Sequence, residues 1–213
     1  MTTEVEDRLQ RAPVVPLVQA DNPETAVQIT RALVAGGLTV VEVVLRTPAA
    51  LACLREVAKS VPEACVGVGT VLSADQAREA IDAGAAFIVS PGLDDGVVEV
   101  AQSNELPVYP GIASATEAQH AWNLGLRSVK FFPAGQAGGT AMLKALSSVF
   151  GGMKFMPTGG VSAGNLVEYL AIPSVLACGG SWLTPKDAIE AGDFEDITKL
   201  ASSALEIAQS VRG

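Results

Sequence analysis

Short apolar runs alternate with longer amphipathic segments along the whole chain. Each unit begins with a valine-rich run, passes through a polar turn, continues with a helical pattern and ends near a glycine. A further helical pattern at residues 4–11 precedes the first run. The apolar runs predict eight β-strands, at residues 14–18, 40–45, 65–68, 87–89, 107–109, 129–132, 154–156 and 175–178.

The predicted helices carry recognisable start and stop signals. Asn22 and Thr47 each precede a proline, which favours a capped helix start directly after them. Two other starts have the spacing of a capping box, Ser73 with Gln76 and Ser114 with Glu117. Glycines stand where helices are expected to end, at positions 36, 37, 84 and 125.

Strand–helix alternation of this kind predicts an α/β protein with a parallel sheet. Eight units favour closure into a (β/α)8 TIM barrel, here with an extra N-terminal helix. No linker or change in composition divides the chain, so residues 1–213 are expected to form a single domain. An open doubly wound sheet is the alternative architecture.

Composition narrows the class of partner. The net charge is −9, which argues against nucleic acid and anionic membranes. No apolar stretch approaches the roughly 18 residues of a membrane span, and the acidic N-terminus does not resemble a targeting peptide. Cys53, Cys65 and Cys178 are few and widely spaced, which is typical of buried, reduced thiols. A cytoplasmic protein is expected.

Lys130 is the residue that points most directly to chemistry. It interrupts the apolar run at 129–132, where an ammonium must be paired, reach a polar cavity or lose its proton. A neutral lysine is a nucleophile that can form a Schiff base with a carbonyl substrate. The alternative is a structural lysine whose stem is buried and whose head reaches solvent. Because side chains alternate along a strand, Lys130 and Phe132 share one face, and that face is expected to line the barrel interior.

The second strand places two charged residues on one face. Glu42, Val44 and Arg46 alternate with apolar residues that suit the helix layer, so Glu42 and Arg46 are expected to point into the barrel. They lie roughly 13 Å apart along the strand, too far for a direct ion pair. Each therefore needs another partner or a substrate. Glu42 and Lys130 would supply an acid/base and a nucleophile in one cavity.

Small and glycine-rich segments end several strands. Thr70 follows the third strand, the pair Gly159-Gly160 follows the seventh, and the pair Gly179-Gly180, with Ser181 after it, follows the eighth. Paired glycines let backbone N–H groups approach an anion closely, and barrels often bind phosphate after strands seven and eight. Simple turns are the alternative for either pair alone. Both pairs together favour a phosphate site.

The chain resembles the 2-keto-3-deoxy-6-phosphogluconate (KDPG) aldolases, which include the bifunctional 4-hydroxy-2-oxoglutarate aldolases. The resemblance extends from residue 13 to residue 195 and is specific because seven motifs occur in order. The motifs are Glu42-Val43-Val44-Leu45-Arg46-Thr47, Gly67-Val68-Gly69-Thr70-Val71-Leu72, Ser90-Pro91-Gly92-Leu93, Tyr109-Pro110-Gly111, Lys130-Phe131-Phe132-Pro133-Ala134, Pro157-Thr158-Gly159-Gly160-Val161 and Gly179-Gly180-Ser181-Trp182-Leu183.

The resemblance implies a class I aldolase of the Entner–Doudoroff pathway, usually a homotrimer. It implies cleavage of KDPG to pyruvate and glyceraldehyde 3-phosphate, with Lys130 as the Schiff-base lysine and Glu42 as the acid/base. Binding of the substrate carboxylate is implied for Arg46, Thr70 and Lys130. Phosphate binding is implied for Gly159, Gly160, Gly180 and Ser181, and a place in the pocket wall for Pro91, Phe132 and Thr158.

No metal or other cofactor is expected, because the iminium nitrogen itself draws electrons and the sequence has one histidine and no His/carboxylate cluster with ligand spacing. The nearest alternative is preference for 4-hydroxy-2-oxoglutarate or the galactonate epimer. More distant alternatives are a phospho-sugar isomerase or epimerase and a non-catalytic barrel that binds a phosphorylated metabolite, since fold alone does not decide function.

Overall fold

The computed structural model describes residues 4–212. Strands and helices alternate along the chain, as the hydrophobic pattern predicts. The strands are β1 (Val14–Val18), β2 (Val40–Val44), β3 (Cys65–Gly69), β4 (Ile88–Val89), β5 (Val108–Tyr109), β6 (Gly111–Ile112), β7 (Ser128–Phe131), β8 (Lys154–Pro157) and β9 (Cys178–Gly180). The helices are α1 (Glu4–Arg11), α2 (Pro23–Ala35), α3 (Ala50–Ser60), α4 (Ala74–Asp82), α5 (Asp95–Ser103), α6 (Ala115–Asn123), α7 (Gly139–Val149), α8 (Leu166–Leu170), the 3₁₀ turn η1 (Ser181–Leu183), α9 (Lys186–Ala191) and α10 (Phe194–Arg212).

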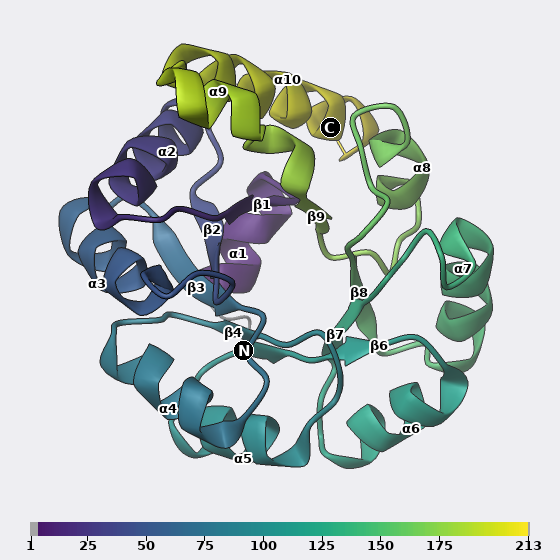
Figure 1. Cartoon of the computed structure of the whole chain (residues 1–213). Coiled ribbons are helices and arrows are strands. Elements are labelled where there is room, and N and C mark those ends of the chain that lie inside the picture. The colour runs from purple at the N-terminus through teal and green to yellow at the C-terminus, as the bar shows by residue number, and fades with distance from the viewer. Residues whose placement is uncertain (1–3, 213) are drawn as a thin grey trace.

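The parallel strands close into a ring; helices α2 to α10 surround it, and α1 lies across one end (Figure 1). Neighbours pair in order from β1 to β5, and from β6 to β8. β5 and β6 are two parts of one strand position, separated by Pro110. Phe155 in β8 bridges to Val175, and the following β9 pairs with β1. The predicted barrel is therefore confirmed, and the open sheet is excluded.

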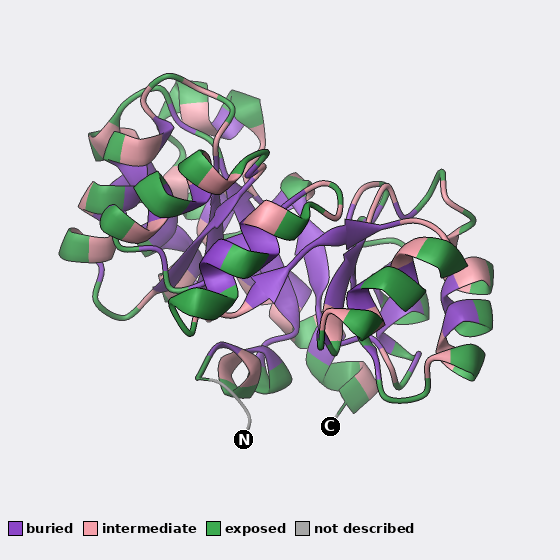
Figure 2. Cartoon of the chain, turned by 90° about the horizontal axis from the view of Figure 1, so that it is seen from below, coloured by how far each residue is buried: buried purple, intermediate pink, exposed green. Residues whose placement is uncertain are grey.

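Two apolar layers account for the alternation along each strand. Val41, Val43 and Phe131 pack outward among the helices. Val40 and Met156 belong instead to a smaller interior cluster, together with Phe87, whose ring meets Tyr109 edge-on at 6.1 Å between centroids. Figure 2 shows the buried strands enclosed by helices whose outer faces are exposed. A valine-rich strand that is covered on both faces is typical of a parallel barrel.

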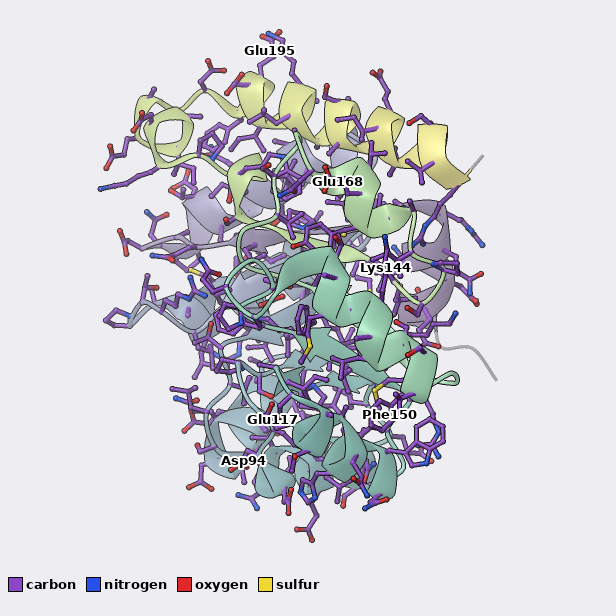
Figure 3. The ribbon with its side chains drawn as sticks, turned by 90° about the vertical axis from the view of Figure 1, so that its right-hand side faces the viewer. Asp94, Glu117, Lys144, Phe150, Glu168 and Glu195 are labelled. Carbon is purple, nitrogen blue, oxygen red and sulfur yellow. The ribbon has the colours of Figure 1, made fainter. Side chains whose placement is uncertain are left out.

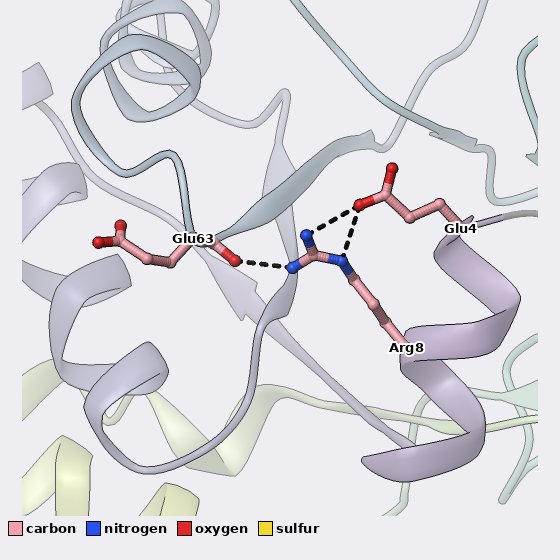
Figure 4. A network of polar contacts seen from close by, with 3 residues as sticks. All are labelled: Glu4, Arg8 and Glu63. Atoms are coloured by element: carbon pink, nitrogen blue, oxygen red, sulfur yellow. Dashed lines mark hydrogen bonds and ion pairs between the residues drawn. The ribbon is translucent and has the colours of Figure 1, made fainter.

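The extra helix α1 closes the N-terminal end of the barrel. Val5 and Leu9 join the interior cluster, and Leu9 is 0% exposed. Arg8 holds the helix in place: it donates to Glu4 within α1 and, at 2.7 Å, to the backbone carbonyl of Glu63 before β3 (Figure 4). With this end filled, the C-terminal end of the barrel is the side on which a polar site can form.

Two local predictions were wrong. Thr47 does not cap α3, which begins at Ala50 without a side-chain cap; the Thr47 hydroxyl donates instead to the carbonyl of Ala20 at 2.9 Å. The eighth strand is β9, which begins at Cys178, where the prediction ended. Residues 175–177 are buried and precede it, so burial and not strand pairing produced their apolar pattern.

Candidate active site

Glu42 and Lys130 are the only charged residues between positions 4 and 212 that are buried, at 1% and 3% exposure. Glu42 stands two residues after Val40 on the interior face of β2, and Lys130 lies opposite Met156 in the register of β7 and β8. The predicted inward orientation of both residues is therefore confirmed. Unpaired charges in a barrel core are costly, which marks this interior as a candidate site.

The carboxylate of Glu42 has unused hydrogen-bonding capacity. Neither of its oxygens meets a hydrogen-bond partner within residues 4–212. A buried acceptor without a partner typically costs about 1–3 kcal/mol, and more when it is charged. The space for this carboxylate comes from Gly69 at the end of the neighbouring strand, whose missing side chain leaves the volume open.

Lys130 faces an aromatic wall. Its Nζ lies 4.9 Å from the centroid of the Phe132 ring, within cation–π range, and its backbone N–H donates to the carbonyl of Pro110 at 2.9 Å. The Phe132 ring also lies against Gly159, where an added Cβ would be 3.3 Å from the ring. Phe132 therefore connects the amine on β7 to the glycine-rich segment after β8.

Arg46 and Thr70 meet across the ends of β2 and β3. The Arg46 Nε donates to the Thr70 hydroxyl at 3.2 Å, so the two predicted carboxylate-binding residues are adjacent. Arg46 also lines a cavity of about 470 Å³ that it shares with Ser181, Gln19 and Lys186. One cavity at the C-terminal end of the barrel is thus lined by both Arg46, predicted to bind the carboxylate, and Ser181, predicted to bind the phosphate.

The glycine-rich segments after β8 and at the end of β9 lie close together. Gly159 and Gly160 adopt φ values of 87° and 81°, which other residues rarely do. A Cβ on Gly179 would lie 2.3 Å from the hydroxyl of the buried Thr158, so the two segments approach each other closely. Gly180 follows, and Ser181 is exposed at the start of η1.

Pro91 packs against Gly111, the residue paired with Lys130 on the neighbouring strand. Its carbonyl oxygen would be only 2.1 Å from a Cβ on Gly111, and Gly111 lies opposite Lys130 in the register of β6 and β7. The buried Ser90 hydroxyl donates to the carbonyl of Gly92 at 2.7 Å, which holds this turn.

Several residues near the site escaped prediction. Gln19 and Lys186 line the cavity, but a single polar residue after a strand or at a helix start is too common to stand out. Gly69 and Gly111 are close-contact positions whose partners lie on other strands. For Gly69, the sequence did offer a signal: Gly67 and Gly69 alternate with valines, so both glycines fall on the interior face of the strand.

The remaining charged groups lie mainly outside the barrel. Lys144 on α7 and Glu195 on α10 are exposed, and Figure 3 shows them on the helix layer. His120 is exposed and contacts Asp95 at 2.7 Å, as expected of a surface histidine. Over the described part of the chain, no three His, Cys, Asp or Glu side chains gather as metal ligands. Between residues 4 and 212, no helix is long and apolar enough to cross a bilayer.

Known proteins with similar sequences are aldolases. The family model for KDPG and KHG aldolase matches residues 5–200. The chain belongs to this family. The KHG/KDPG aldolase of Escherichia coli K12 is 47% identical over 204 residues, which cover 96% of each chain.

Two solved structures of related aldolases contain small molecules. The KDPG aldolase of Legionella pneumophila, 39% identical with a TM-score of 0.91, contains pyruvate as a covalent carbinolamine intermediate; the match covers 95% of this chain and 98% of that one. The 2-keto-3-deoxy-6-phosphogluconate aldolase of Zymomonas mobilis ZM4, 42% identical with a TM-score of 0.87, contains 3-phosphoglycerate; the match covers 94% of each chain.

Proposed function

We propose that this protein is a class I aldolase that cleaves KDPG to pyruvate and glyceraldehyde 3-phosphate. The observation that carries the proposal is the presence of Lys130 and Glu42 as the only buried charges of the described barrel. The covalent pyruvate carbinolamine in the Legionella relative supports amine chemistry in this family. The 3-phosphoglycerate in the Zymomonas relative supports a small phosphorylated substrate.

The proposed reaction begins at Lys130. Its neutral amine attacks the C2 ketone, and the carbinolamine loses water to give an iminium. Glu42, through a water molecule, accepts the proton of the C4 hydroxyl as the C3–C4 bond breaks. The electron pair of that bond moves toward the iminium and leaves an enamine, and the aldehyde product departs. Glu42 then returns a proton to C3, and hydrolysis releases pyruvate and the free amine. No metal is required, because the cationic nitrogen accepts the electrons.

The other predicted residues would hold the two anionic ends of the substrate. Arg46 and Thr70 present a charged and a neutral donor side by side, which suits the carboxylate beside the ketone. Gly159, Gly160, Gly180 and Ser181 would bind the phosphate through backbone N–H groups and a hydroxyl. Pro91, Phe132 and Thr158 would form the apolar and small walls between these ends.

A second keto acid is a specific alternative substrate. The Escherichia coli relative is named KHG/KDPG aldolase, which supports activity on 4-hydroxy-2-oxoglutarate as well as on KDPG. Both substrates would use the same amine and carboxylate and differ in the phosphate end. Rates with KDPG, its galactonate epimer and 4-hydroxy-2-oxoglutarate would rank the three.

We also propose that the protein acts as a homotrimer in the cytoplasm, with residues 1–213 forming one domain. The family resemblance supports the trimer, and the closed ring of strands supports the single domain. The free, buried cysteines are consistent with a reducing compartment. A monomeric mass in light scattering would contradict the assembly.

Imine trapping tests the function directly. Incubation with pyruvate followed by borohydride should leave a reduced adduct on Lys130 and not on the exposed Lys144 or Lys154, as located by peptide mass spectrometry. Excess EDTA should not lower the yield. Lys130→Arg keeps the charge but cannot form the imine, so trapping and turnover should disappear together. Cleavage that survives in this variant, or an adduct on another lysine, would contradict the role of Lys130 as the Schiff-base residue.

A further inference from the structure

We infer that Gly69 is a positioning residue for Glu42, an inference that rests on the proposed acid/base role of that carboxylate. Gly69 ends β3, beside the strand that carries Glu42. A Cβ built on Gly69 would lie 1.8 Å from the Glu42 Oε1, 2.5 Å from its Cδ and 2.6 Å from its Cγ. All three distances are far inside van der Waals contact. The Glu42 side chain therefore occupies the volume that any side chain at position 69 would need.

The backbone gives no other reason for glycine at this position. Gly69 lies outside the positive-φ region, whereas the next residue, Thr70, has a φ of 63°. Alanine can adopt an extended strand conformation without strain. The requirement at position 69 is therefore one of space and not of backbone conformation.

Gly67 provides an internal comparison. It lies two residues earlier on the same face of β3, and its Cβ would meet the Phe87 ring at 2.4 Å. Phe87 is a rigid ring within the interior cluster and cannot give way by turning only the end of its side chain. The Glu42 carboxylate is instead the end of a flexible side chain and can rotate away. Gly67→Ala should mainly damage the core, while Gly69→Ala should mainly displace the carboxylate.

Displacement matters because a general base acts only within hydrogen-bond reach of the proton that it moves. A misplacement of about 1 Å can cost roughly 10²-fold in rate. We expect Gly69→Ala to lower kcat by about 10- to 100-fold, with a smaller change in KM, because Arg46 and Ser181 are not displaced.

A double-mutant cycle tests whether Gly69 acts through Glu42. The wild type, Gly69→Ala, Glu42→Gln and the double variant would be compared for KDPG cleavage and for exchange of the pyruvate C3 hydrogens with deuterated water. Gly69→Ala should reduce both rates in the wild-type background and change them by less than about twofold when Glu42 is already glutamine. Borohydride trapping of pyruvate should remain, because Lys130 is untouched. Fully additive losses, or lost trapping, would overturn the inference.

The same cycle separates the two proposals. Wild-type turnover in Glu42→Gln would contradict the role of Glu42 itself, whatever Gly69 does. An impaired Glu42→Gln with additive losses would contradict only the role of Gly69.

Thermal melting keeps the test decisive if Gly69→Ala folds poorly. Truncating the partner in Glu42→Ala/Gly69→Ala removes the atoms that clash, so the double variant should melt higher than Gly69→Ala alone. A melting temperature that stays low would show that the clash lies elsewhere. Gly151→Ala is the matched control for a glycine substitution, since Gly151 is exposed and its Cβ would meet nothing within 4 Å.

Discussion

The Arg46 Nε donates to the Thr70 hydroxyl at 3.2 Å and joins the end of β2 to the end of β3. Thr70 holds its hydroxyl there from a φ of 63°, an outlier for a β-branched residue that typically costs about 1–3 kcal/mol. Hydrogen bonds on both sides hold this conformation, from Leu45 to the Gly69 carbonyl at 2.8 Å and from Val71 to the Val89 carbonyl at 3.3 Å. The guanidinium is therefore oriented before any substrate arrives.

Removing the Thr70 hydroxyl should weaken substrate binding. Thr70→Val keeps the shape and β-branching, so the backbone strain is unchanged. The variant loses the hydroxyl as an acceptor from Arg46 and as a donor to the substrate carboxylate. A hydrogen bond to a charged group contributes about 1.5–3 kcal/mol, which corresponds to a KM roughly 10- to 100-fold higher for keto-acid substrates. Steady-state kinetics would measure this change. Thr70→Ser is the control, since it keeps the hydroxyl. If the serine variant had a KM as high as that of the valine variant, the hydroxyl would not be what binds the substrate.

Removing the charge of Glu42 should slow the chemical step. Proton transfer by a positioned side chain typically contributes about 10²–10⁴-fold to rate, so Glu42→Gln should lower kcat by about that factor. The amide fills the same volume, and its neutral form suits a buried position, so the melting temperature should not fall. Turnover near that of the wild type would mean that another group moves the proton.

The Ser181 hydroxyl should distinguish phosphorylated from non-phosphorylated substrates. Ser181→Ala should raise KM for KDPG by about 10-fold, the size of one hydrogen bond to a charged group, and hardly change it for 4-hydroxy-2-oxoglutarate. Because Ser181 is exposed, the loss of its hydroxyl should not affect folding. Equal losses with both substrates would indicate that Ser181 shapes the cavity and does not contact phosphate.

Glu117 should make stability depend on acid pH. Its Oε2 accepts from the Ala113 N–H and the Ser114 hydroxyl, both at 2.8 Å, and these hydrogen bonds, chiefly that from Ala113, hold the pKa of the carboxyl below its ordinary value of 4.5. A lowered folded-state pKa contributes stability above the ordinary value, and this contribution is lost as the pH falls through the folded-state pKa.

Glu117→Gln tests that contribution, because glutamine keeps an acceptor but does not titrate. The variant should be less stable than the wild type by about 1 kcal/mol near neutral pH. Urea denaturation between about pH 7 and pH 3 should show this difference shrinking in the acid range. A difference that is independent of pH would assign the effect to hydrogen-bond geometry and not to charge.

The cysteines should be inert in the native protein. Cys53, Cys65 and Cys178 are buried, and desolvation raises the pKa of each thiol above its ordinary value. Because the thiolate is the reactive form, a thiol reagent near neutral pH should label none of them until the protein unfolds. Labelling counted by mass spectrometry with and without guanidinium checks this, and rapid modification of the native chain would contradict the burial.

The periodicity of the sequence was sufficient to predict the architecture, because strand and helix patterns depend on residues that are close together in the chain. Alternation along residues 40–45 assigned Glu42 to the interior, and the same alternation argument assigned Lys130 to the interior face of its strand. Capping at Ser73 and Ser114 was also predictable, because those hydrogen bonds span only three residues. The boundary of β9 and the start of α3 were not, because burial of residues 175–177 and the contact of Thr47 with Ala20 depend on distant parts of the chain.

The sequence by itself therefore determined the barrel, its inward charges and the residue types available for imine chemistry. Only the tertiary structure decided which of these groups are neighbours. The Arg46–Thr70 hydrogen bond, the Phe132 ring against Gly159 and the Glu42 carboxylate in the space left by Gly69 each join residues that lie on, or just after, different strands. Such contacts depend on register and closure of the ring, and these are set by packing of the whole barrel and not by local sequence pattern.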